Sequence, residues 1–475
     1  MIWSIAWKNV WRSKRRSLVV IIAVTIGTIA GVFTAGLMKG WVDQRIESAI
    51  FTEVSHIQIH NKNYLINEEL KYTVPQPEKL IQFLKNSDEV KAFSNRLKVM
   101  AMASTSLGNT GLKLQGIHLK DEEAVSDIYK KIQPDGGTFL QAGEKNRVVI
   151  SDKTAEQLRI KTYMVTDEVL DSLKKLEVPQ DALTTLEEIK GTRFNTKKLF
   201  QSKLEEILSK KDQNNYGRII TETSRHYRLR TKIVFTFTGK DGQMVYQAFR
   251  VCGIYKTTNT MFDQMNAYVL YDDLANLAGF NGNVFHETAV ILNSGNDLKK
   301  FKSELQDKFS DLSILDWKEL APDAGMLSQY MNFYYYIIMG FILFALAFGI
   351  INTMLMAILE RLKELGMLLA IGMNKKKVFS MIMLETIFLT LVGAIIGMIL
   401  GAVIIYITGR TGINLSSVGE GMEAMGWASV IYPGIEWHFF FGITLMVILT
   451  AILSSIMPAR KALKLKPADA LRIDM

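Results

Sequence analysis

The stretch Glu360-Arg-Leu-Lys-Glu-Leu-Gly-Met-Leu-Leu-Ala-Ile-Gly-Met-Asn374 is followed by three lysines at 375–377 and separates two long apolar runs. Leu362, Leu365 and Leu369 recur in it at helical spacing among charged side chains. This pattern predicts a short amphipathic helix at the boundary between membrane and water. A connector between two spans needs only a few residues, so the extra length indicates that the segment contacts something.

Outward from this stretch, four runs of sequence are nearly uncharged: 17–38, 331–359, 378–408 and 438–457. A helix of about 20 apolar residues crosses a hydrocarbon core of about 30 Å, so we expect four transmembrane helices. The residues between the first and second runs have the composition of an ordinary soluble domain. The predicted parts are an amphipathic N-terminal segment 1–16, transmembrane helices 17–41, 331–359, 378–408 and 438–457, a large domain 42–330, connecting loops 360–377 and 409–437, and a tail 458–475.

The distribution of charge predicts the topology. The chain has 475 residues, a formal net charge of +9 and a mean hydropathy of +0.12. Nucleic-acid binding is one interpretation of that charge, but much of it flanks the apolar runs, which favours a membrane protein. The flanking residues are Lys8, Arg12, Lys14, Arg15 and Arg16, then Arg361, Lys363 and 375–377, and finally Arg460, Lys461, Lys464, Lys466 and Arg472. The positive-inside rule then places both termini and 360–377 in the cytoplasm, and 42–330 and 409–437 outside it.

The large domain mixes strand and helix patterns, which predicts an α+β fold. Its single cysteine, Cys252, excludes a disulfide within the chain. Residues 166–227 are rich in charged residues and leucine and predict a helical insertion; a partly ordered charged loop is the alternative. The expected strands are His56–His60, Lys232–Thr238 and Met244–Val251, and the expected helices are Pro77–Lys85, Lys153–Leu158, Thr196–Lys210 and Asn296–Phe309.

Two rows of glycine recur every four residues in the membrane runs. Gly27 and Gly31 lie in the first run, and Gly393, Gly397 and Gly401 in the third. Such rows let helix backbones approach closely, so we expect them at helix contacts, although glycine is also simply frequent in membrane helices.

Tryptophan also recurs every four residues before the first run, at Trp3, Trp7 and Trp11. On a helix these side chains share a face beside basic residues, which is typical of a helix lying at the cytoplasmic surface of a membrane.

The sequence contains no recognisable catalytic or metal site. His56 and His60 would lie about 13 Å apart on a strand, which favours an outward-facing strand edge over a metal pair. His286 and Glu287 begin like a zinc-protease motif, but Val290 stands where the second histidine is required. No glycine-rich phosphate loop is present, so we expect no enzyme activity and no cofactor here. ATP and Mg²⁺ would be bound by a partner chain.

Glu385 is the exceptional ionisable residue within the predicted spans. An intramembrane carboxylate is a candidate functional group. The alternative is a pairing role with a nearby lysine at the cytoplasmic end of the span.

Three stretches resemble the MacB/FtsX-type ABC transporter permeases. They are the pattern from Glu360-Arg-x-x-Glu-Leu-Gly366 to Ala370-Ile-Gly372, the tail from Pro458-Ala-Arg-Lys-Ala462 through Pro467 to Ala470-Leu-Arg472, and the basic segment Trp7–Arg16. Leu365 replaces the family's more usual isoleucine. One span, a large outer domain and three further spans is also the layout of that family. The likeness is firm at both membrane ends and looser in the outer domain.

The resemblance implies how such a chain works. Residues 360–374 would be the coupling helix, seated in a groove of a separate cytoplasmic ATPase. The implied coupling residues are Glu360, Arg361, Lys363, Glu364, Gly366, Ala370 and Gly372. A dimer of permease chains, identical or not, would bind two ATPase subunits and transmit their motion to the outer domain.

Within that family, Ser55–His60 resembles the lipoprotein-releasing LolC/LolE-like branch. Drug or peptide efflux in a tripartite pump and control of cell-wall hydrolases are the alternatives, and a sensor without an ATPase is a third. The implied location is the bacterial inner membrane, with a periplasmic adaptor, chaperone or lipoprotein as a further partner and no nucleic acid.

Overall fold

The computed structural model describes residues 2–12 and 14–464, which form two compact units. The membrane unit contains the described residues up to Arg45, Met326–Gly419, and those from Ala428 to Lys464. The sheet unit contains Ile46–Gly325 and Glu420–Trp427. The part of the C-terminal signature from residue 465 onward, including Pro467, Ala470 and Arg472, lies outside the described residues.

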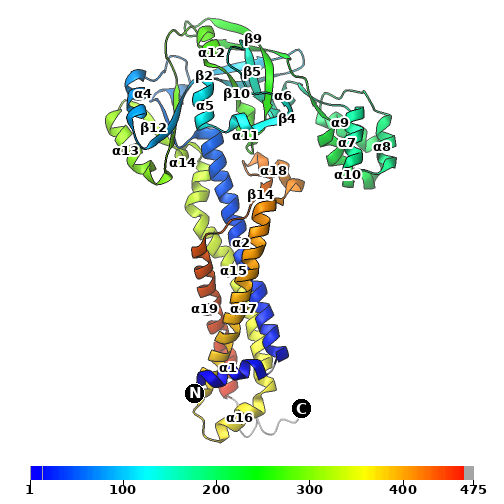
Figure 1. Ribbon diagram of the computed structural model, residues 1–475, viewed down its shortest axis with the longest axis vertical. Coiled ribbons are helices and arrows are strands. Elements are labelled where there is room, and N and C mark those ends of the chain that lie inside the picture. The colour runs from blue at the N-terminus through cyan, green and yellow to red at the C-terminus, as the bar shows by residue number, and fades with distance from the viewer. Residues whose placement is uncertain (1, 13, 465–475) are drawn as a thin grey trace. The chain divides into compact units, whose positions relative to one another are not determined.

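Four long helices run side by side in the membrane unit (Figure 1). They are α2 (Lys14–Ser48), α15 (Pro322–Glu360), α17 (Lys375–Thr411) and α19 (Trp437–Lys464). Within the described residues, four helices are long and apolar enough to cross a membrane, which confirms the predicted number. Buried side chains from all four, such as Val24, Met339, Leu389 and Ile443, share one apolar core.

The shorter elements of this unit lie at helix ends. Helix α1 (Ile2–Arg12) precedes α2, and α16 (Leu362–Ala370) lies between α15 and α17. The rings of Trp3 and Trp7 contact Phe388 of α17 edge-on, at centroid distances of 5.7 and 5.4 Å. Two short strands, β13 (Ile413–Asn414) and β14 (Val430–Ile431), pair between α17 and α19.

The glycine row of α17 lies directly against α2. A Cβ atom on Gly397 would lie 2.7 Å from Thr28 Cβ and 2.8 Å from the carbonyl oxygen of Thr25. Cβ atoms on Gly393 and Gly401 would come equally close to α2. The two helices therefore pack at a separation that only a hydrogen side chain allows.

The glycines of α2 itself face a different helix. A Cβ on Gly27 would meet Leu346 of α15 at 3.1 Å, and one on Gly31 would meet Met339 at 2.7 Å. Helix α2 thus contacts α17 with one face and α15 with another, so all five glycines of the two rows lie at contacts within this chain.

The sheet unit is built on a ten-stranded sheet with the order β12-β1-β11-β2-β3-β10-β5-β9-β4, with β8 paired to both β2 and β9. The strands are Ile57–Asn61 (β1), Val90–Ser104 (β2), Asn109–Ile117 (β3), Ile132–Gly137 (β4), Arg147–Ser151 (β5), Lys232–Thr238 (β8), Met244–Tyr255 (β9), Asn266–Leu270 (β10), Glu287–Leu292 (β11) and Leu312–Asp316 (β12). This confirms a large α+β domain between the first and second long helices.

Helices pack on the sheet and divide its apolar interior into separate cores. Leu80 of α4 and Phe301 of α13 are buried with Ile59 in one core, and Leu274 of α12 is buried with Phe235 in another. The helices of this unit are Tyr64–Asn67 (α3), Pro77–Asn86 (α4), Leu119–Val125 (α5), Asp152–Gln157 (α6), Thr260–Met265 (α11), Tyr271–Ala278 (α12), Leu298–Lys308 (α13) and Trp317–Leu320 (α14).

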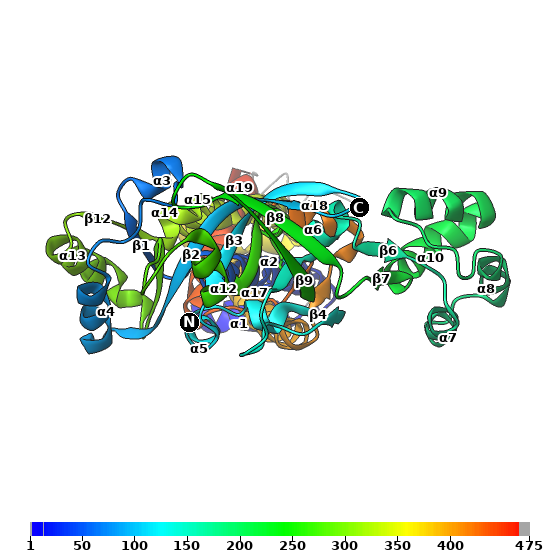
Figure 2. The ribbon, with the colours of Figure 1, turned by 90° about the horizontal axis from the view of Figure 1, so that it is seen from above.

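Residues 164–224 form a lobe of helices instead of a charged loop (Figure 2). Its apolar core contains Leu173, Phe200 and Ile220. The lobe is joined to the rest of the unit through β6 (Lys161–Tyr163) and β7 (Arg225–Tyr227), which pair antiparallel. Its helices are Asp167–Lys175 (α7), Gln180–Glu187 (α8), Lys197–Ile207 (α9) and Lys210–Thr223 (α10).

One carboxylate on α6 holds both strands of that connection. Lys161 Nζ lies 2.8 Å from Asp152 Oδ2, and the hydroxyl of Tyr227 donates to Asp152 Oδ1 at 2.6 Å. Lys161 and Tyr227 are cross-strand partners, so Asp152 contacts both at the start of the lobe. Burial would raise the pKa of Asp152, but Lys161, Tyr227 and Arg225 together outweigh this effect and lower the pKa.

Two boundaries differ from the prediction. The basic Lys14 belongs to α2 instead of preceding it, because the helix continues through the charged flank. The connection 409–437 is not a single loop: residues 420–427 belong to the sheet unit, where Glu423 pairs with Lys256 at 2.9 Å. A contact between residues so distant in sequence leaves no local pattern.

Candidate functional site

Residues 360–374 form a compact reversal of the chain between α15 and α17. Helix α15 ends at Glu360, Arg361 breaks the helical geometry, and α16 follows from Leu362. Gly372 has φ +94°, a left-handed conformation that glycine adopts without strain. Asn374 then begins α17 by accepting a hydrogen bond from the backbone N–H of Lys376 at 2.9 Å.

A chain of ion pairs ties α16 to its neighbours. Arg361 Nη1 lies 3.0 Å from Glu385 Oε2 of α17, and Arg361 Nε lies 3.0 Å from Glu364 Oε2. The other oxygen of Glu364 lies 3.1 Å from Arg12 Nη2 of α1. Two carboxylates and two guanidinium groups therefore link three helices in sequence.

Glu385 is only 5% exposed, and Arg361 is an ion-pair partner that the sequence did not indicate. The family resemblance implies that Arg361 contacts the ATPase; in this structure its guanidinium contacts Glu385 and Glu364. A cavity of about 20 Å³ adjoins the pair, lined also by Met354 and Met381. That volume has room for about one water molecule beside the two charges.

Helix α16 has an inner and an outer face. Leu365 is buried and Leu369 is half-buried against the shared core of the long helices, so both seat the helix on the membrane unit. The side chain of Leu362 lies outside the described residues. Met367 is 51% exposed and Ile371 is 80% exposed, which places two apolar side chains, four residues apart, on the outer face.

The remaining coupling residues divide between these faces. Glu360, Lys363, Ala370 and Gly372 are exposed, and Gly366 is buried. The sequence prediction did not include Met367 and Ile371 among the residues of the exposed face. Both follow Lys363 at helical spacing, by four and eight residues, and this spacing indicates that the three side chains share one face of the helix.

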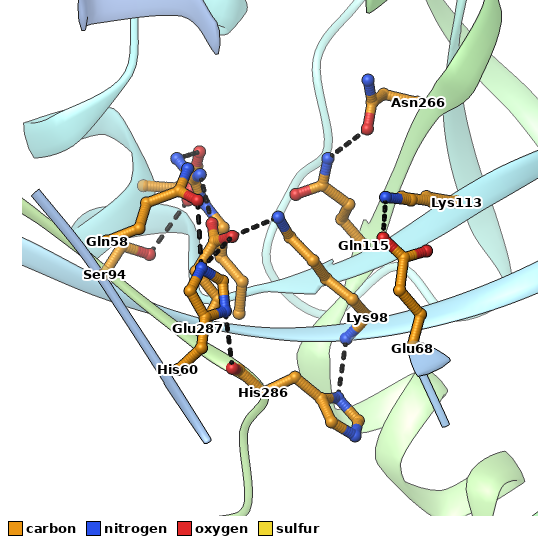
Figure 3. Close-up of polar contacts among 12 residues, drawn as sticks. Gln58, His60, Glu68, Ser94, Lys98, Lys113, Gln115, Asn266, His286 and Glu287 are labelled. Carbon is orange, nitrogen blue, oxygen red and sulfur yellow. Dashed lines mark hydrogen bonds and ion pairs between the residues drawn. The ribbon is translucent and has the colours of Figure 1, made fainter. Parts of the chain in front are cut away.

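A second cluster of polar residues lies buried in the sheet unit (Figure 3). Arg96 donates to Glu122 at 2.7 and 2.9 Å and to Glu287 at 2.8 Å. Lys98 also contacts Glu287, so two cations surround this fully buried carboxylate. Burial alone would raise the pKa of Glu287, but Lys98 and Arg96 lower it to about 2.

The cluster corrects the prediction for His60. Strand β1 lies between β11 and β12, so His60 is not on a sheet edge, and it is 1% exposed. Its Nε2 lies 3.1 Å from Gln58 Oε1 and its Nδ1 lies 3.1 Å from the carbonyl oxygen of His286. Alternation of polar and apolar residues cannot distinguish solvent from a buried polar partner on the opposite face.

Burial lowers the pKa of both His60 and His286 to about 4. Tyr64 stacks between the two rings, at centroid distances of 5.8 and 4.8 Å. Within the described residues, no group of histidine, cysteine and carboxylate side chains could hold a metal ion. The cluster joins β1, β2, β11 and α5, and we assign it to the stability of the sheet unit.

Helices α16, α17 and α19 and most of α15 lie in a stretch that matches a family model. The model described as "FtsX-like permease C-terminal" matches residues 336–467. Residues 336–467 are thus similar to the C-terminal domain of FtsX-like permeases. The match begins inside α15 and includes the Arg361–Glu385 pair and the whole of α16.

Proteins similar to this chain are named as ABC transporter permeases. One, from Methanocaldococcus jannaschii, is 29% identical over 47% of this chain and 55% of its own length. The permease YknZ of Bacillus subtilis is 24% identical over 51% of this chain and 59% of its own length. The macrolide export ATP-binding/permease protein MacB of Chlorobium luteolum is 34% identical over 26% of this chain and 16% of its own length. The chain thus spans little more than half of the first two relatives.

Among solved structures, the extracellular domain of YknZ from Gram-positive bacteria aligns with 55% of this chain and 99% of its own, at 16% identity and a TM-score of 0.29. The periplasmic region of MacB from Actinobacillus actinomycetemcomitans aligns with 58% of this chain and 92% of its own, at 12% identity and a TM-score of 0.28.

Proposed function

We propose that this protein is the membrane subunit of an ABC transporter and that it docks a separate cytoplasmic ATPase through α16. The observation that carries the proposal is the two-sided construction of this helix. Leu365 and Leu369 fix it to the membrane unit, and Met367 and Ile371 stay exposed beside Lys363. Anchors one helical turn apart are typical of a helix that lies in a groove of another protein.

The Arg361–Glu385 pair supports a role in transmitting motion. It joins the start of α16 to α17 by two contacts of 3.0 and 3.3 Å, inside the membrane unit. A charge-assisted contact of this kind is strong and directional. A displacement of α16 by an ATPase would therefore be passed to α17, and α17 would pass it to α2 through the glycine contacts.

The proposal includes a location and an assembly. The four apolar helices and the permease relatives indicate an integral membrane protein. We place it in the bacterial inner membrane with both termini cytoplasmic, on the distribution of basic residues. Two permease chains, identical or different, would carry two ATPase subunits, and the ATPase would bind ATP and Mg²⁺.

The cargo is a separate proposal. Lipoprotein release is the first candidate and rests on the resemblance of Ser55–His60, whose last residue is buried in the polar cluster. Efflux of a drug or peptide is the second candidate, and the relatives named as macrolide exporters support it. Lipoproteins retained in the inner membrane of a deletion strain would favour release, and increased macrolide sensitivity would favour efflux.

The docking proposal is tested on full-length protein purified with its native partners. We expect Met367→Asp and Ile371→Asp to abolish copurification of the ATPase, because each buries a charge in the groove. Met261→Asp is the matched control, since Met261 is 71% exposed in the sheet unit. An ATPase that remains bound to both α16 variants, or is lost equally from the control, would overturn the proposal.

A further inference from the structure

One face of the neighbouring strands β3, β2, β8 and β9 is open in the sheet unit. Inward positions such as Val99, Ala101 and Phe235 are buried in the core. The outward positions Met102 and Tyr246 are 48% and 66% exposed. The side chains at these outward positions point away from the core and stay exposed.

The strand register gathers the outward apolar residues into one patch. Met102 lies opposite Gly111 on β3 and opposite Thr236 on β8, and Thr236 lies opposite Tyr246 on β9. A Cβ on Gly111 would meet nothing within 4 Å, so the patch is open there too. We call this patch the Met–Tyr face; it consists of Met100, Met102, Val234, Met244 and Tyr246, each at least 39% exposed.

A row of cations borders this face. Lys232 lies directly opposite Arg250 in the β8–β9 pair, and Arg250 lies opposite Arg147 on β5. Like charges directly opposite each other destabilise a sheet. Arg147 has Glu144 at 3.4 Å, but the described residues supply no ion-pair partner to Lys232 or Arg250.

The outward positions of the four strands carry no counter-charge of their own. None of the residues at 100, 102 and 104, at 109 and 111, at 232, 234, 236 and 238, or at 244, 246, 248 and 250 is aspartate or glutamate. Repulsion between Lys232 and Arg250 would be relieved by an anionic surface brought from outside the chain.

We propose that the Met–Tyr face is a docking surface for a protein whose contacting segment is apolar and acidic. Methionine, tyrosine and arginine are enriched at protein interfaces, which favours a protein over a lipid surface. A second copy of this chain fits poorly, because its own face would bring a second row of cations against the first. This inference does not depend on the coupling role of α16.

The test places a photo-crosslinking residue in the full-length chain in native membranes, as Tyr246→p-benzoylphenylalanine. The same residue at Met261, which is exposed on α11, is the matched control. We expect crosslinks from position 246 to a protein segment that contains apolar residues and at least one carboxylate. Capture alone does not support the proposal; the charge dependence below decides it.

Adding Lys232→Glu or Arg250→Glu separately should lower the crosslink yield at least about tenfold, since juxtaposed like charges cost several kcal/mol. Replacing the partner's carboxylate by lysine should restore the yield. An unchanged unfolding temperature shows that each variant is folded. A yield insensitive to both charge reversals, crosslinks to lipid or to a second copy of this chain, or the same products from position 261 would overturn the proposal.

Discussion

The guanidinium of Arg361 is engaged inside the membrane unit. Its guanidinium contacts Glu385 and Glu364, so the arginine belongs to the internal framework that holds α16 in place. In the same segment Met367 and Ile371 stay exposed, and our proposal gives the outward contact to these two apolar side chains. A charged residue in a membrane-proximal loop is therefore weak evidence for an intermolecular contact.

Removing one member of the buried pair should destabilise the membrane unit. We expect Glu385→Gln to lower the free energy of unfolding by about 3 kcal/mol, because it leaves the Arg361 charge without its main counterpart. The double variant with Arg361→Gln should recover part of that loss. Thermal unfolding of the full chain in detergent measures both, with the exposed Glu360→Gln as control. Equal stability of the wild type and Glu385→Gln would contradict the pairing.

The buried histidines predict a dependence of stability on pH. Their pKa of about 4 in the folded protein lies below the usual 6.5, so the unfolded chain binds more protons between these values. Stability is then fully present above about pH 6.5 and falls as the pH decreases toward 4. We expect the unfolding temperature to drop in this window and the drop to be smaller in His60→Gln. The exposed His226→Gln should leave the drop unchanged.

At the scale of elements, the contact between α17 and α2 sets a limit on side-chain size. We expect Gly397→Ala to destabilise the protein by about 1–3 kcal/mol, because the added methyl group would lie 2.8 Å from a backbone oxygen of α2. Gly340→Ala on α15 is the matched control, since a Cβ there meets nothing within 4 Å and should be neutral or stabilising. Similar unfolding temperatures for the two variants would show that the close approach is not required.

The connection to the helical lobe depends on Asp152. We expect Asp152→Asn to weaken its contacts with Lys161 and Tyr227 and to speed amide hydrogen exchange in β6 and β7. The lobe core around Phe200 should keep its protection, because it packs independently of Asp152. Because the pKa of Asp152 is lowered, acidification of the wild type through that pKa should produce the same loosening. An equal increase of amide hydrogen exchange in the β6–β7 pair and in the lobe core would show that Asp152 does not act locally on the connection.

Elements with a strong local period could be predicted closely, and their contacts could not. Alternation gave β8 with the bounds that the structure has, and apolar length gave the four long helices. The side of α16 that packs inward, the partner of Glu385 and the burial of His60 all depend on residues far away in sequence. Periodicity predicts which residues of one helix or strand share a face, but it does not predict which residues of other elements contact that face.

At the scale of the whole molecule, the topology can be tested with engineered cysteines in a Cys252→Ser background. Leu199→Cys, at a position 58% exposed on the helical lobe, should react with a membrane-impermeant maleimide once the outer envelope is permeabilised and the inner membrane is intact. Lys375→Cys, beside α16, should react only after the inner membrane is opened. Labelling in the reverse order would invert the proposed orientation.

The way the helical lobe is joined to the chain bears on how such a protein diversifies. The lobe leaves and re-enters the sheet unit through two paired three-residue strands, so its two ends are neighbours. A segment inserted or deleted between those ends leaves every strand register of the ten-stranded sheet as it was. We therefore expect that the lobe can be removed or replaced as a single segment while the sheet and the membrane helices keep their fold.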